Sequence, residues 1–204
     1  MRHVLLGCLA FIIALFFDFA ALKRIPYLKQ AIGIISISLF SYSLIMVSLD
    51  AERLQLPDWS SHAGWPLLLV SVSLLVYSLF LEIPFRRTYA ANGVGDRLVE
   101  TGTYALVRHP GVLWLALFLL GLVLVSRSRL LLLATPVWLL MDVLYVCVQE
   151  RFLFRKMFPG YEQYQQETPM LIPTRESMAR CLRTLRIRGG KEGSLPNPEG
   201  RWEG

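Results

Sequence analysis

The apolar residues of this chain gather into long runs that short polar stretches separate. Four runs reach the roughly 20 residues that a helix needs to cross a bilayer core: residues 3–22, 30–49, 64–84 and 130–149. A fifth run, 111–125, is shorter and would reach about 22 Å at 1.5 Å per residue. The pattern therefore predicts an all-α polytopic membrane protein with five transmembrane helices.

The connections between these runs refine the prediction. Only Ser126-Arg-Ser-Arg129 separates the last two runs, which predicts a tight helical hairpin. The first run follows Arg2 but lacks a small-residue cleavage site after it, so we expect a retained helix and not a signal peptide.

Composition agrees with a membrane protein. Hydrophobic residues make up 54% of the 204 residues and charged residues only 18%, whereas soluble domains are about one quarter charged. This balance excludes a disordered chain and disfavours a soluble globule. Three widely separated cysteines, Cys8, Cys147 and Cys181, indicate neither a disulfide framework nor a metal site.

Basic residues predict the orientation of the chain. With five spans, ten of the basic residues near the spans fall on one side and four (Arg2, Arg53, Arg127 and Arg129) on the other. The positive-inside rule places the richer side in the cytoplasm. We therefore expect the C-terminus and any polar chemistry between residues 86 and 110 and after residue 149 to be cytoplasmic, with the N-terminus opposite.

The tail after residue 173 is basic, with seven basic and four acidic residues. Met178, Leu182 and Leu185 share one face of a predicted helix, which favours a cytoplasmic amphipathic helix on the anionic inner leaflet over a nucleic-acid partner. Residues 189–204 are rich in Gly, Pro and charge, so we expect disorder there. The chain thus divides into one membrane domain, 1–173, and a tail, 174–204.

The first candidate motif is Gly102-Thr-Tyr-Ala-Leu-Val-Arg-His-Pro110. Pro110 suits the first position of the fourth helix. Arg108 and His109 would then lie beside free backbone N–H groups at the positive end of that helix, which favours an anion site. Alone, the motif also fits a topogenic arginine followed by a helix-starting proline.

The second candidate motif begins at Gln149-Glu150 and continues through Tyr161 and Tyr164 to Pro173. Glu150 would lie at the negative end of the fifth helix, where a carboxylate needs a cationic partner. Arg108, Arg151 or a ligand ammonium are candidates, and a surface pairing with Arg151 or Lys156 is the alternative. The tyrosines alone also fit an interfacial structural role.

Together the two motifs resemble the superfamily of isoprenylcysteine carboxyl methyltransferases and phospholipid N-methyltransferases. The shared pattern is G-x-Y-x-x-x-R-H-P, a short helical hairpin, E-E-x-x-L, F-x-x-Y-x-x-Y and a closing I-P. The resemblance covers residues 95–173. It implies S-adenosylmethionine-dependent methyl transfer to a lipophilic acceptor, which would be a prenylcysteine-like carboxylate, a thiol or a lipid amine.

The resemblance also implies site residues. It assigns cofactor binding to Tyr104, Arg108, His109, Pro110, Gly121, Glu150, Tyr161 and Tyr164, and catalysis to Glu150, Arg151 and Gln149. Arg108 and His109 suit the cofactor carboxylate, Glu150 suits a cation and is the expected base for an amine acceptor, and tyrosines suit a sulfonium or adenine. Gly121 has a second interpretation as a small residue that lets two helices pack closely.

Two departures from the family pattern weaken the transfer of the family's substrate to this chain. Gln149 replaces the first glutamate of the pair, and Val112 replaces a frequent tyrosine. The alternatives are a membrane reductase of related architecture with a nicotinamide cofactor, or a non-catalytic membrane scaffold. The sequence sets no oligomeric state.

Three acidic residues lie inside predicted spans, where an isolated charge is costly. We expect Asp18 to pair with Lys23 or Arg24, and Glu82 to pair with Arg86 one turn away. Asp142 shares a helix face with Tyr145 and Gln149. That face would line an acceptor cavity, or Asp142 would be a buried hydrogen-bonded acid.

Overall fold

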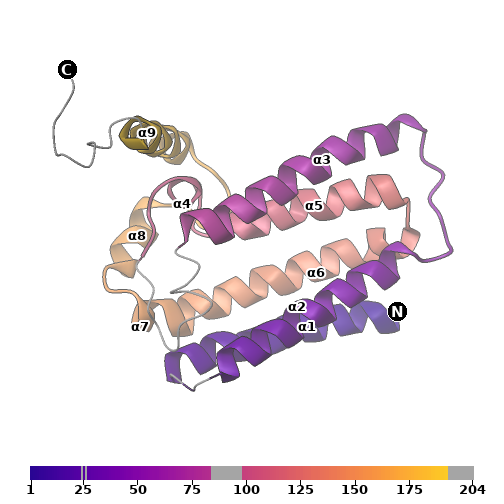
Figure 1. Ribbon diagram of the computed structural model, residues 1–204, viewed down its shortest axis with the longest axis horizontal. Helices are drawn as coiled ribbons and strands as arrows, with labels where there is room; N and C mark the ends of the chain where they lie inside the picture. Colours follow the sequence, from indigo (N-terminus) through magenta and orange to yellow (C-terminus); the bar gives the residue numbers. More distant parts are fainter. Residues whose placement is uncertain (24, 26, 84–97, 193–204) are drawn as a thin grey trace, which may run out of the picture.

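The computed structural model describes residues 1–23, 25, 27–83 and 98–192, with side chains up to residue 185. Five helices run along one common direction (Figure 1): α1 (Arg2–Lys23), α2 (Leu28–Ser48), α3 (Trp59–Val76), α5 (Pro110–Ser126) and α6 (Arg129–Val148). Two π-helical turns prolong α3 and α6, namely η1 (Tyr77–Glu82) and η3 (Gln149–Phe154). The remaining helices are α4 (Thr103–Leu106), α7 (Arg155–Met157), α8 (Tyr161–Glu167) and α9 (Arg175–Glu192).

The structure confirms the all-α membrane architecture. Four helices are long and apolar enough to cross a membrane, counting the π-helical extensions, and α5 is the shorter fifth. The predicted spans are reproduced closely, except that the third helix begins at Trp59 instead of residue 64. No β-strand occurs in the described ranges.

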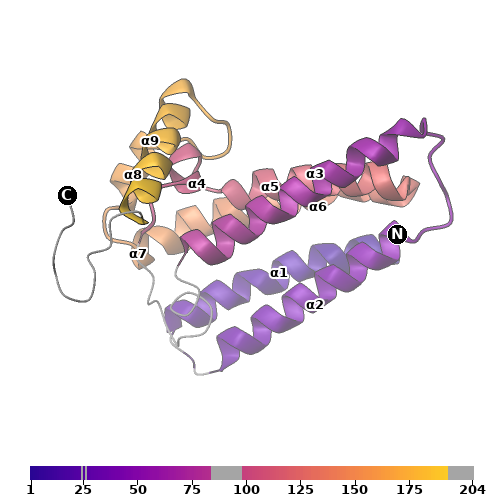
Figure 2. The same ribbon diagram turned by 45° about the horizontal axis from the view of Figure 1, so that its top comes forward.

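The five helices form two closely packed pairs, α1 with α2 and α3 with α5, and α6 lies between the pairs (Figures 1 and 2). The predicted hairpin between α5 and α6 is present, turned by the left-handed backbone of Arg127 at φ 54°. Ser128 then begins α6, because its hydroxyl accepts the N–H of Leu131 and donates to the carbonyl of Val47. The main packing partner of α5 is nevertheless α3.

The tightest core lies at the hairpin end of the bundle. Trp138 is fully buried there among Val4, Val47, Leu131 and Ala134, and its indole N–H donates to the carbonyl of Val4 at 3.0 Å. At the other end, where α5 begins and α6 ends, these two helices separate (Figure 1). We call this the open end.

A series of hydrogen bonds between side chains holds α4 against the open end. The indole N–H of Trp114 donates to Ser78 Oγ, which lies 2.9 Å from Thr103 Oγ1, and Glu82 accepts from both the backbone N–H and the hydroxyl of Thr103. The carboxylate of Glu82 thus already accepts hydrogen bonds from Thr103. Arg86, its expected partner, lies outside the described residues.

Helix α9 runs across the bundle direction at the open end (Figures 1 and 2). It packs on α4 through the side that carries Ser177 and Cys181, both buried, while Met178 and Leu182 are exposed. The helix continues to Glu192, so the prediction of disorder from residue 189 is wrong for residues 189–192. Residues 193–204 lie outside the description.

Candidate functional site

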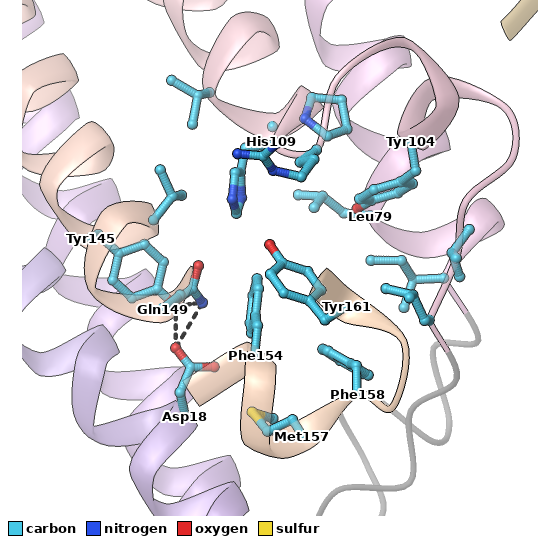
Figure 3. Close-up of a pocket in the computed structure, with 18 of the residues that line it drawn as sticks. Asp18, Leu79, Tyr104, His109, Tyr145, Gln149, Phe154, Met157, Phe158 and Tyr161 are labelled. Atoms are coloured by element: carbon cyan, nitrogen blue, oxygen red, sulfur yellow. Dashed lines mark hydrogen bonds between the residues drawn. The ribbon is translucent and has the colours of Figure 1, made fainter. Parts of the chain in front are cut away.

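A cavity of about 400 Å³ lies at the open end, within the roughly 300–1,000 Å³ range usual for small-molecule sites. Every described helix except α9 contributes to its walls, as do Arg108 and His109 just before α5 (Figure 3). Apolar surface dominates. The aromatic members of the wall are Phe17, Tyr104, Tyr145, Phe154, Phe158, Tyr161 and Tyr164.

Glu150 joins the two sequence motifs into one structure. Its Oε1 accepts hydrogen bonds from Arg108 Nε at 2.7 Å, His109 Nε2 at 2.8 Å and the Tyr161 hydroxyl at 3.0 Å. Its Oε2 accepts from Arg108 Nη2 at 3.1 Å and Gln165 Nε2 at 3.0 Å. We call these five residues the Glu150 clamp. The clamp thereby holds Arg108 and His109 beside Glu150, which follows them by 42 and 41 positions in the chain.

The position of Glu150 limits its chemical role. The carboxylate is buried and does not line the cavity, and both oxygens already accept hydrogen bonds. Arg108, His109 and Tyr161, in contrast, are part of the wall. Glu150 therefore orients wall residues from behind and is badly placed to take a proton from a bound acceptor.

Arg108 is also largely engaged by the chain itself. Its Nη1 donates to the carbonyls of Gln165 and Thr168 at 3.0 and 2.5 Å. The backbone N–H groups of Arg108 and His109 donate to the carbonyls of Pro169 and Met170. The predicted anion site with free N–H groups at these two residues is therefore wrong, because the segment after α8 crosses this turn and occupies them.

Pro110 begins α5 as predicted, with His109 as the residue before the helix. The His109 ring stacks on Phe154 at a centroid distance of 5.9 Å, and the rings of Tyr161 and Phe154 meet edge to face at 5.4 Å. Figure 3 shows the Phe154 and Tyr161 rings next to each other, with the Tyr161 hydroxyl directed toward His109. The motif residues thus form a contiguous aromatic wall.

The two tyrosines of the second motif keep their protons. Burial, followed by the nearby charge of Glu150, raises the pKa of Tyr161 well above its ordinary value. Burial likewise raises the pKa of Tyr164, whose hydroxyl donates to the carbonyl of Tyr104 at 2.6 Å. Both hydroxyls are therefore donors at neutral pH, which keeps Tyr161 bound to Glu150.

Gln149 belongs to a separate polar group on the other side of the cavity. Its side-chain N–H₂ donates to Asp18 Oδ2 and to the Tyr145 hydroxyl, which itself donates to Asp18 Oδ2 at 2.8 Å (Figure 3). Asp18 therefore ties α1 to α6. Of its expected partners, Lys23 instead places its ammonium over the ring of Phe19, and Arg24 is outside the described residues.

Two predicted site residues lie away from the cavity. Arg151 is exposed, with its guanidinium over the ring of Phe152. Gly121 lies between α5 and α3, where an added Cβ would come within 3.2 Å of the backbone of Gly64 and Leu68. The packing interpretation of Gly121 is the one that the structure records.

Sequence reasoning missed Lys29, whose buried side chain lines the cavity with its ammonium 5.3 Å from the centre of the Phe17 ring. In the sequence, Lys29 is only one of the basic residues that predict the orientation of the chain. Sequence reasoning also missed Gln165 and Thr168. Their backbone carbonyls accept from Arg108 and the Gln165 side-chain amide donates to Glu150, and no periodic pattern in the sequence marks such groups. Val112, at the position where the resembled family often has tyrosine, lines the cavity as a buried apolar residue.

Membrane-length helices with an aromatic cavity at one end define a small multi-pass membrane protein. The chain belongs to the family described as "Protein of unknown function (DUF1295)", which matches residues 20–168. That match spans the cavity walls from α2 onward and the whole Glu150 clamp. No curated protein and no solved structure matches the chain.

Proposed function

We propose that the protein transfers a methyl group from S-adenosylmethionine to a lipophilic acceptor. The observation that carries this proposal is the meeting of two distant motifs at the Glu150 clamp, on the wall of an aromatic cavity among membrane-length helices. An S-adenosylmethionine site needs groups for a sulfonium, an adenine, a carboxylate and an ammonium.

The wall residues fit these four groups. Ring faces attract cations and stack on planar bases, and Tyr104, Phe154 and Tyr161 supply rings on several sides of the cavity. Lys29 is a cation in the wall that suits a carboxylate. Asp18 is an acidic wall residue suited to an ammonium.

The bound donor would supply an activated methyl group, so the protein chiefly has to align two reactants and exclude water. The apolar walls of the cavity favour both, and the Glu150 clamp would hold His109 and Tyr161 in fixed positions. A cavity placed among membrane-length helices also suits an acceptor that dissolves in the bilayer. We propose that the open end faces the cytoplasm, in keeping with the excess of basic residues there.

We also propose that α9 rests on anionic lipid. Exposed Met178 and Leu182 occupy a helix that runs across the bundle direction, and Arg175, Arg180 and Arg183 lie on the same helix. Replacing both Met178 and Leu182 by glutamate is expected to lower methyl-transfer activity in vesicles that contain phosphatidylserine. Activity in detergent should stay unchanged. Equal losses in both media would contradict a role at the lipid surface.

The rival function is a reductase with a nicotinamide cofactor. The family match leaves both chemistries open, because the description of the family assigns no function. Aromatic walls would also accept a nicotinamide ring. The two functions are separated by which cofactor binds.

A calorimetric titration of the detergent-purified protein tests the proposal. S-Adenosylhomocysteine is expected to bind to the parent protein. Tyr161→Ala should lower its affinity at least tenfold, because the variant loses a ring contact with the ligand and loosens the clamp. A tenfold loss of affinity corresponds to about 1.4 kcal/mol of binding free energy. Tyr42→Ala is the matched control, since Tyr42 is a half-exposed ring of α2 that packs on His3 outside the cavity. Binding of NADPH alone would replace the methyltransferase proposal with the reductase.

A further inference from the structure

Among the residues that the structure describes, no side chain pairs with Asp142, an acidic residue of the cavity wall. Asp142 is 9% exposed and lines the cavity from α6. Within the residues that the structure describes, it makes no hydrogen bond and no ion pair. An isolated ionisable group inside a membrane span is costly, and such residues usually mark a functional site. The missing partner is then a group of the ligand.

The neighbours of Asp142 on α6 show why it differs from the other polar residues. Tyr145, Val146 and Gln149 follow it on the cavity face at helical spacings of three, four and seven. Tyr145 and Gln149 are bound to Asp18, and Val146 is apolar. Asp142 is thus placed deeper along α6 than this polar group, seven residues, or about 10 Å, from Gln149.

The two ends of the cavity differ in chemistry. Of the clamp residues, Arg108 and His109 precede α5, Tyr161 and Gln165 lie on α8, and Glu150 lies in η3 at the end of the α6 span. Asp142 lies within α6, and apolar residues of α5 and α1, such as Leu115 and Ala21, also line the cavity. A lipophilic acceptor that enters from the bilayer would occupy this inner part, which puts Asp142 against the acceptor and not against the polar parts of the methyl donor.

We propose that Asp142 is a catalytic residue of the acceptor site, and that the acceptor is an amine on a lipophilic chain. This inference rests on the proposed function and decides among the three acceptor classes. An ammonium would supply the missing counter-charge of Asp142. A carboxylate acceptor would bring a second negative charge into an apolar site, where like charges are strongly unfavourable.

The reaction at this site balances in charge and atoms. The acceptor ammonium gives one proton to the Asp142 carboxylate, which leaves a neutral amine with a lone pair. That lone pair forms the new nitrogen–carbon bond while the methyl carbon–sulfur bond breaks, and the bonding electrons stay on sulfur. The positive charge passes from sulfur to the methylated nitrogen, and the proton on Asp142 leaves when product is released.

Binding of a simple amine tests the proposal without relying on turnover. Labelled dodecylamine is equilibrated with the full chain in nanodiscs, and binding to empty nanodiscs is subtracted. We expect saturable binding to the parent protein, a loss of at least tenfold in affinity for Asp142→Asn, and partial recovery for Asp142→Glu. Asp58→Asn is the matched control, because Asp58 is an almost fully exposed carboxylate paired with Arg127.

S-Adenosylhomocysteine affinity of the same variants separates this inference from the proposed function. Asp142→Asn should bind S-adenosylhomocysteine like the parent protein while methyl transfer to dodecylamine is lost. Unchanged amine binding in Asp142→Asn would overturn the role of Asp142, and stronger binding of dodecanoate or dodecanethiol than dodecylamine would overturn the acceptor class. A parent protein that fails to bind S-adenosylhomocysteine contradicts the proposed function instead.

Discussion

Replacing Glu150 with alanine is expected to abolish S-adenosylhomocysteine binding and to lower the melting temperature by about 6–20 °C. The variant removes the acceptor for Arg108, His109, Tyr161 and Gln165 at once. It leaves the Arg108 guanidinium, only 11% exposed, without its counter-charge. Breaking a buried pair in this way costs about 3–5 kcal/mol, and 1 kcal/mol shifts melting by roughly 2–4 °C in a chain of this size.

Two further variants make this expectation specific. Glu150→Gln keeps one acceptor oxygen but turns an N–H₂ group toward other donors, so most of the loss should remain. Glu162→Ala removes an exposed carboxylate that lies 3.8 Å from Arg155, and it should change the melting temperature by no more than about 4 °C, because surface pairs contribute about 0–1 kcal/mol. Thermal melting and calorimetry measure both effects. A Glu150→Ala protein that binds S-adenosylhomocysteine like the parent would contradict the clamp.

Replacing Gly102 with alanine is expected to detach α4 from the open end. Gly102 has φ +63°, a conformation that costs other residues about 1–2 kcal/mol. A Cβ at this position would also lie 1.6 Å from Glu82 Oε1, which receives the N–H of Thr103. Glu82 would have to leave its buried partners, so we expect a loss of several kcal/mol and weaker S-adenosylhomocysteine binding through Tyr104.

Gly160→Ala is the matched control for this variant. Gly160 also has a positive φ, +85°, but an added Cβ would meet nothing within 4 Å. Its alanine variant should show only the backbone cost of about 1–2 kcal/mol. The difference in melting temperature between the two variants measures the steric effect at Glu82. Equal melting temperatures of Gly102→Ala and Gly160→Ala would contradict the role of Glu82 in holding α4.

The sequence predicted the helices and the motif residues well because both are local or periodic signals. Membrane spans appear as apolar runs, and Pro110 marks a helix start wherever the helix lies. The pairing of Glu150 with Arg108 was one of several candidates, since charge alone does not say which partner is near. The structure selected it by folding η3 against the start of α5.

Other parts of the site depend on contacts that no local pattern encodes. Asp18 binds Gln149 across 131 residues, and the carbonyls of Pro169 and Met170 take the N–H groups that a helix start would otherwise leave free. Glu82 binds Thr103 instead of a residue on its own helix. Lys29 looks like one more loop cation until α2 is packed against α1. Such features follow from the tertiary fold.

Methyl transfer itself tests the central proposal most directly. The full chain in nanodiscs is incubated with S-adenosylmethionine labelled on its methyl group and with dodecylamine, and the label is measured in the organic extract. The proposal predicts label in methylated dodecylamine for the parent protein and for Glu162→Ala, and almost none for Glu150→Ala. Absence of transferred label from the parent protein to amine, thiol and carboxylate acceptors alike, under conditions in which NADPH binds, would contradict it.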